Sequence, residues 1–151
     1  MAKQSGWQAW LTPLCLTLWV GGLWMTGITA SVLFKTIPDR QLAGLVAGKL
    51  FTLISVIGMV SGLWLLVSLL ASDGLRALKQ GLFWGLLLMW GLVLVGEFGI
   101  QPLLAQLKAS ALPNDVMQSV FASRFKTWHG VASVAYLLEC LLGVWLVLRL
   151  R

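Results

Sequence analysis

The stretch Leu86–Leu104, LLLMWGLVLVGEFGIQPLL, decides the fold of this chain. A helix that crosses the hydrocarbon core of a bilayer needs about 20 mostly apolar residues, so the stretch predicts a transmembrane helix. One acid, Glu97, interrupts the apolar run near its far end. A charged carboxylate at the centre of such a helix costs roughly 2.5–3.5 kcal/mol on insertion scales, which points to a function and to a partner group.

The composition of the whole chain agrees with a membrane protein. Hydrophobic residues make up 59% of the 151 residues and charged residues 11%, and the mean hydropathy is +0.90. Soluble domains average about 45–50% apolar and about 25% charged residues. The net charge of +6 comes from Lys and Arg beside the hydrophobic runs, where membrane proteins carry flanking cations. We therefore expect no nucleic-acid partner.

The hydrophobic pattern predicts four spans, at about residues 9–34, 42–70, 81–105 and 128–148, in a single domain of residues 1–151. The segment before the fourth span, DVMQSVFASRFKTW (115–128), places Met117, Phe121 and Arg124 on one face and polar residues largely on the other. This pattern predicts an amphipathic helix that either lies in the interface or runs straight into the fourth span. The expected fold class is all-α: an integral membrane four-helix bundle with this helical extension.

Prolines and small residues predict the helix ends and the packing seam. In KTIPDR (Lys35–Arg40), Pro38 ends the first helix and Asp39 is the expected N-cap of the second. Ala71–Gln80 is expected to be a short polar connection at the opposite membrane face. Pro102 frees the carbonyl group of residue 98 and can kink the third span.

A stripe of small residues along the second span predicts the seam of the bundle, or a contact with a second copy of the chain. The stripe comprises Gly44, Gly48, Thr52, Ser55, Gly58 and Gly62.

The positive charges do not decide the orientation of the four spans. One side carries Lys3, Arg76, Lys79, Arg149 and Arg151, and the other carries Lys35, Arg40, Lys108, Arg124 and Lys126. The first group lies in a tight loop and in tails directly beside the spans. We therefore expect a multi-pass protein of the inner (plasma) membrane with cytoplasmic termini. The first span lacks a convincing signal-peptide cleavage site and is expected to remain.

Seven polar residues of the last three helices are the candidate ligand-binding residues: Lys49, Glu97, Gln101, Arg124, His129, Tyr136 and Glu139. Helical spacing places those from His129 to Glu139 within an arc of about 120° on the fourth span. Polar residues inside a membrane nearly always face the bundle interior. The pattern therefore predicts one shared polar cleft that opens on the side of KTIPDR.

Each of these residues also has a simpler structural interpretation. Lys49 can extend to the interface along its apolar stem. Glu97 can anchor two helices through an ion pair with Lys49 or Arg124, and His129 can be an interfacial hydrogen-bonding residue. Glu139 is the hardest to explain structurally, because it lies near mid-membrane with no basic residue on its own helix within three turns before Arg149.

Several kinds of chemistry are not supported by the residues present. A single histidine excludes a bis-histidine haem site and a histidine cluster for zinc or copper. Cys15 and Cys140 lie inside apolar runs and form neither a disulfide framework nor a metal spacing. No phosphate-binding loop or nucleophile elbow is present. No catalytic residue and no metal ligand is assigned, and the identity of any cofactor stays open.

Three stretches together resemble a known family. They are GGLWMTGITASVLFKTIPDRQLAGLVAGKLF (21–51), GEFGIQPLLAQLK (96–108) and SRFKTWHGVASVAYLLECLLG (123–143). Their order is similar to that in the transmembrane-protein-205-like family of small four-span proteins, whose biochemical activity is unassigned. The motifs fall on Phe34, Ala43, Gly44, Gly48, Phe51, Pro102, Phe125 and His129. The resemblance implies a membrane protein that handles small molecules or metals.

Three functions remain open from the sequence. The preferred hypothesis is a non-enzymatic protein that binds or passes a small solute, an ion or a lipid through the polar cleft. A second is a membrane redox enzyme that uses a quinone or haem near His129 and Tyr136. A third is a structural subunit whose glycine stripes pack against a second copy of the chain or against a larger complex.

Overall fold

A computed structural model describes residue 6, residues 8–111 and residues 116–149. Lys3, Asp115 and Arg151, which the sequence interpretation uses, lie outside the described residues. The element order is α1 (Gln8–Thr36), α2 (Arg40–Asp73), η1 (Gly74–Lys79), α3 (Gly81–Leu94), η2 (Val95–Ile100), α4 (Gln101–Ala111), η3 (Val116–Gln118) and α5 (Ala122–Arg149).

The expected fold class is confirmed. Four helical segments are long and apolar enough to cross a membrane: Ala9–Thr36, Arg40–Lys79, Gly81–Ala111 and Ala122–Arg149. No strand occurs in the part of the chain that the structure describes. After η3 and a short turn, α5 begins at Ala122 and runs without a break into the fourth span. Residues 122–128 of the predicted amphipathic extension thus form the first turns of the spanning helix.

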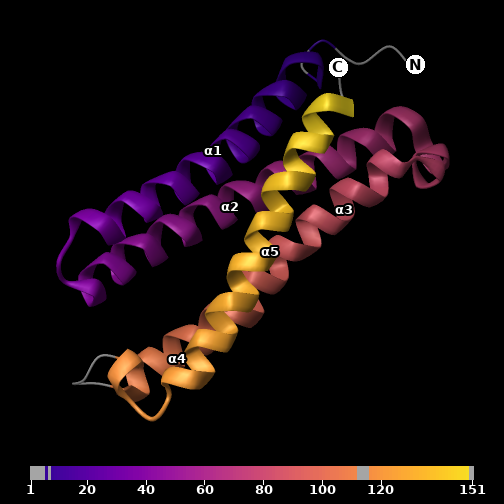
Figure 1. The fold of residues 1–151 in the computed structure, drawn as a ribbon. Helices are drawn as coiled ribbons and strands as arrows, with labels where there is room; N and C mark the ends of the chain where they lie inside the picture. Colours follow the sequence, from indigo (N-terminus) through magenta and orange to yellow (C-terminus); the bar gives the residue numbers. More distant parts are fainter. Residues whose placement is uncertain (1–5, 7, 112–115, 150–151) are drawn as a thin grey trace.

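The four spans pack as a closed ring in which α2 contacts α1 and α3, and α5 contacts α3 and α1. Because each span reverses direction, the start of α1, η1 and the end of α5 lie at one end of the bundle, here called the terminal end (Figure 1). The connection 37–39, the end of α4 and the start of α5 lie at the other, here called the turn end. In Figure 1 the α1–α2 pair and the α4–α5 pair diverge toward the turn end.

The tightest packing lies in the terminal half of the bundle. Trp19 of α1 is fully buried, and its ring lies against Gly58 of α2, where an added Cβ would come within 2.5 Å of the indole Nε1. Gly62 of α2 accommodates the rings of Trp19 and Trp90, and Gly85 of α3 accommodates the ring of Trp145. Since lipid tails are as apolar as these side chains, close packing of this kind is what holds membrane helices together.

The glycine stripe of α2 changes character toward the turn end. An added Cβ at Gly48 would meet no atom within 4 Å, and one at Gly44 would meet only Lys108 Nζ and Phe34, each at 3.9 Å. The stripe is therefore a tight helix–helix contact at Gly58 and Gly62 and a loose one at Gly44 and Gly48. This gradient agrees with the divergence of the helices in Figure 1.

The turns differ in how closely they follow expectation. The Asp39 carboxylate accepts hydrogen bonds from the N–H groups of Gln41 at 2.8 Å and Leu42 at 3.1 Å, which confirms the predicted N-cap. The connection after α2 is more helical than expected, because η1 continues directly from Gly74. Gly74 has a φ of +57° that ends α2, and Ala77 is fully buried against the bundle.

The third span contains a π-helical turn, η2, where the sequence suggested a kink. The N–H group of Gln101 donates to the carbonyl group of Gly96, five residues earlier. Pro102 has no N–H group and cannot donate to the carbonyl group of Phe98, which weakens the α-helical alternative at this point. The wider turn lets the helix continue as α4.

Candidate functional site

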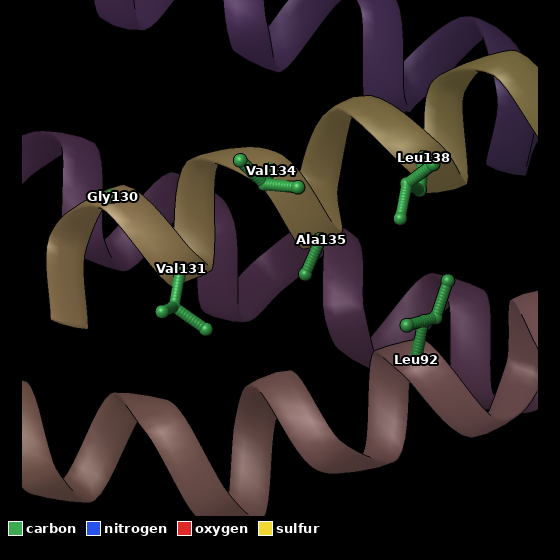
Figure 2. A pocket seen from close by; sticks show the side chains of 6 residues that line it. All are labelled: Leu92, Gly130, Val131, Val134, Ala135 and Leu138. Atoms are coloured by element: carbon green, nitrogen blue, oxygen red, sulfur yellow. The ribbon is translucent and has the colours of Figure 1, made fainter. Parts of the chain in front are cut away.

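An open groove lies between α3 and α5 (Figure 2). Its volume is about 440 Å³ and its lining is entirely apolar, formed by Leu92, Gly130, Val131, Val134, Ala135 and Leu138. In Figure 2, Leu92 projects from α3 toward α5, while Val131, Ala135 and Leu138 project from α5 toward the facing helix. Five of the six lining residues therefore come from one face of α5.

Small residues contribute to the groove on its α5 side. On α5, Gly130 has no side chain and Ala135 has only a methyl group. In the same span as Leu92, η2 contacts α5 and carries Gly96 and Gly99, which do not line the groove. An added Cβ at Gly96 or Gly130 would meet no atom within 4 Å, and one at Gly99 would meet only Val95. Of these three glycines, Gly130 is the one that leaves space unfilled in the groove.

The groove is open to the surroundings of the bundle. Val131, Val134 and Leu138 are 45%, 60% and 47% exposed. These residues lie in a segment long and apolar enough to cross a membrane, so in a bilayer the groove opens sideways onto lipid. Its lining offers no hydrogen-bonding side chain. The groove is therefore suited to a hydrocarbon group and not to an ion.

None of the seven residues predicted to bind a ligand lines this groove. Tyr136 lies on the inner side of α5, and its hydroxyl group donates a hydrogen bond to the main-chain carbonyl of Leu23 on α1. Its ring meets Phe51 of α2 edge-on, with ring centroids 5.0 Å apart. Tyr136 thus joins three helices.

Glu139 lies one turn beyond Tyr136 and is only 7% exposed. Within the described residues its carboxyl group has no hydrogen bond and no ion pair. Helical spacing places it near Gly143 on the side of α5 that packs against Val20 and Met89. A polar side chain is therefore buried here among apolar neighbours.

Glu97 and Gln101 are half-buried, Glu97 within η2 and Gln101 directly after it. The Oε2 atom of Glu97 is fully buried and lacks a hydrogen-bond partner in the described part of the chain. The two cations proposed as its partners, Lys49 and Arg124, are both exposed, and neither forms an ion pair with any described residue.

The remaining predicted residues lie on the outside of the bundle. Lys49 follows the buried Ala47 by two residues, which turns it to nearly the opposite side of α2. His129 is exposed and stacks on Phe125, with ring centroids 5.7 Å apart and planes inclined by 9°. The structure thus places Tyr136 and Glu139 inside the bundle, and Lys49, Arg124 and His129 outside it. Their ligand-binding roles stay predictions.

Two features of this region were not predicted from the sequence. The groove residues, such as Leu92 and Val131, are apolar positions on apolar helices, so no contrast in the sequence marks them. Lys108 was interpreted only as a flanking cation, but its Nζ lies 5.8 Å from the centre of the Phe125 ring. A cation in the last turn of a span, followed by an aromatic residue in the next helix, is too common a pattern to predict such a contact.

Comparison with known proteins gives one match. A family model described as a domain of unknown function, DUF4149, matches residues 14–113, which include most of α1, all of α2, α3 and α4, and none of α5. No curated protein and no solved structure matched the chain. The match provides no link to the transmembrane-protein-205-like family, so that resemblance stays a prediction. Because the matched region exceeds half of the sequence, the chain belongs to the DUF4149 family.

Proposed function

We propose that this multi-pass membrane protein binds a lipid-like amphiphile whose hydrocarbon chain lies in the groove between α3 and α5. The observation that carries the proposal is the groove itself: about 440 Å³, apolar throughout and open to the side. A predominantly apolar lining is typical of small-molecule sites, and the open side of this groove would leave its occupant in contact with the surrounding lipid. Among the solutes, ions and lipids that the sequence left open, this lining favours a lipid.

The apolar lining argues against an ion as the occupant. Metal ions need oxygen, nitrogen or sulfur ligands, and the groove contributes none from its side chains. The described residues also contain no group of three or more His, Cys, Asp or Glu placed to hold a metal ion. A hydrocarbon chain needs only close contact, which the branched side chains of Val131, Val134 and Leu138 supply.

An experiment on purified protein tests the proposal. The probe is dioleoyl phosphatidylglycerol, added to delipidated protein in detergent and counted as bound lipid by native mass spectrometry. Val131→Trp fills the groove at an exposed position, so we expect the protein to fold and to lose tightly bound lipid. Val144→Trp is the matched control, because Val144 is also exposed on α5 but does not line the groove.

The proposal fails if Val131→Trp retains as much lipid as the control Val144→Trp and the unaltered protein. Circular dichroism and size-exclusion chromatography of each variant show whether the helical bundle is preserved. A loss of lipid in both variants would also contradict the proposal, because binding would then depend on the general surface of α5.

We further propose an inner (plasma) membrane location with cytoplasmic termini, which would put the turn end on the outer side. Arg76 and Lys79 support this orientation because they lie within η1, close to the spans. Single-cysteine probes at Ser110 and Lys79, in a chain with Cys15 and Cys140 replaced, test it. A membrane-impermeant maleimide should label Ser110→Cys in intact cells, and Lys79→Cys only after lysis. The reverse pattern would overturn the orientation.

A further inference from the structure

We infer that Arg124 binds the phosphate headgroup of an anionic phospholipid whose acyl chain occupies the α3–α5 groove. This inference rests on the proposed function and specifies its ligand class. The groove explains how an acyl chain is held, but an acyl chain alone does not distinguish one membrane lipid from another. The selectivity must come from a group near the end of the groove.

Arg124 lies on the groove face of α5. Arg124, Val131 and Leu138 are spaced by seven residues, and two helical turns of 3.6 residues leave successive members only about 20° apart around the helix axis. Val131 and Leu138 line the groove. The same stripe of α5 therefore carries the apolar lining and, toward the turn end, a guanidinium group.

The distances along α5 match one leaflet of a bilayer. At 1.5 Å per residue, Arg124 lies about 10 Å from Val131 and about 21 Å from Leu138 along the helix axis. A bilayer with its headgroups is about 40–45 Å thick, so one leaflet measures about 20–22 Å from headgroup to midplane. If the phosphate of a phospholipid lies at Arg124, the tip of its acyl chain would thus lie near Leu92 and Leu138, at the far end of the groove.

Arg124 is available for such a ligand. It is exposed, and no described residue forms an ion pair or hydrogen bond with its side chain. The neighbouring Lys108 is positioned differently, because its ammonium group lies near the Phe125 ring and Gly44. Guanidinium groups bind phosphate oxygens through paired hydrogen bonds, which suits Arg124 to a phosphate headgroup.

The charge around Arg124 also favours an anion. By sequence, the turn end carries five cations, Lys35, Arg40, Lys108, Arg124 and Lys126, against two acids, Asp39 and Asp115. The Asp39 carboxylate caps α2 by accepting hydrogen bonds from Gln41 and Leu42. This cationic surface attracts an anionic headgroup to the end of the groove.

The test compares two phospholipids with the same chains and different headgroups. Delipidated full-length protein is titrated with dioleoyl phosphatidylglycerol and with dioleoyl phosphatidylcholine, and the lipid-bound fraction is measured by native mass spectrometry. We expect the unaltered protein to prefer the anionic lipid by about fivefold, the factor that corresponds to about 1 kcal/mol for one cation at the membrane surface. Arg124→Gln should abolish this preference. Because phosphatidylcholine carries the same phosphate but no net charge, its binding should weaken less than that of phosphatidylglycerol.

Lys126→Gln is the matched control. Lys126 follows Arg124 by two residues and therefore points away from the groove face, although the same charge is removed. A preference that survives in Lys126→Gln and is lost in Arg124→Gln supports the inference. Equal losses in both variants would overturn it, since the cationic surface as a whole would then attract the lipid.

The outcomes separate the inference from the proposed function. If the unaltered protein binds both lipids equally, and Val131→Trp removes both, the groove binds chains but Arg124 selects no headgroup. If neither lipid is retained by the unaltered protein, or Val131→Trp changes nothing, the proposed function itself fails.

Discussion

The hydroxyl group of Tyr136 on α5 donates a hydrogen bond to the main-chain carbonyl of Leu23 on α1, 113 positions away in the sequence. The two helices meet closely here, because an added Cβ at Gly27 would lie 3.3 Å from Cε1 of the Tyr136 ring. The bond joins the last span to the first. Tyr136 therefore helps to close the ring of helices, whatever else it does.

Replacing Tyr136 by phenylalanine should destabilise the bundle modestly. Tyr136→Phe removes the bond to Leu23 and keeps the ring against Phe51. Hydrogen bonds between membrane helices contribute about 0.6 kcal/mol on average and up to about 1.7 kcal/mol. The free energy of unfolding, measured by titration with a denaturing detergent, should therefore decrease by an amount in this range. Ser133→Ala is the control, since the Ser133 hydroxyl bonds only within its own helix, to His129. An equal loss in both variants would contradict this role for Tyr136.

The two halves of the glycine stripe should respond differently to a larger side chain. Gly58→Leu places atoms where the Trp19 ring lies, and overpacking of this kind typically costs about 1–3 kcal/mol. Gly48→Leu enters open space and should change the free energy of unfolding by less than about 0.5 kcal/mol. Thermal unfolding of the two variants in the same detergent measures the difference. Similar losses would show that the loose half of the stripe is packed in solution, for example against a second copy of the chain.

The fold class followed from the sequence because length and hydropathy alone decide whether a helix crosses a bilayer. The Asp39 cap followed for a similar reason, since its hydrogen bonds are local. The uneven packing of the glycine stripe could not be predicted. Whether Gly58 or Gly48 receives a ring depends on Trp19, which lies on another helix and at a depth that the local pattern does not specify.

The candidate site was harder to predict for a related reason. Polar residues stand out in an apolar sequence, so Lys49 and His129 drew attention although both are exposed. The groove depends in part on what is missing, namely a side chain at Gly130. Glycines serve equally for close packing and for open space, and only the arrangement of the neighbouring helix decides between them.

Replacing the buried Glu139 by the uncharged glutamine should not destabilise the protein. Glu139 is 7% exposed, and its carboxyl group has no hydrogen bond or ion pair with the described residues. A buried charge without a partner destabilises a protein, so Glu139→Gln, which keeps the shape, should leave the thermal midpoint unchanged or raise it. Glu139→Lys should prevent stable expression. If Glu139→Gln instead lowers the thermal midpoint, by a shift that corresponds to about 1 kcal/mol or more in the free energy of unfolding, the carboxyl group forms a specific interaction.

The π-helical turn η2 should shape the groove through Pro102. Pro102→Ala restores an N–H group that can donate to the carbonyl of Phe98, so the α-helical register becomes available. That register would rotate α4 relative to α3 and move η2, which contacts α5 and follows Leu92 of the groove in the same span. We expect binding of dioleoyl phosphatidylglycerol to weaken by roughly fivefold, about 1 kcal/mol, with unchanged helical content by circular dichroism. Pro13→Ala in α1 is the control and should bind as the unaltered protein does, because Pro13 does not line the groove. Unchanged binding in Pro102→Ala would show that small residues alone, without the wider turn, are enough to keep the groove open.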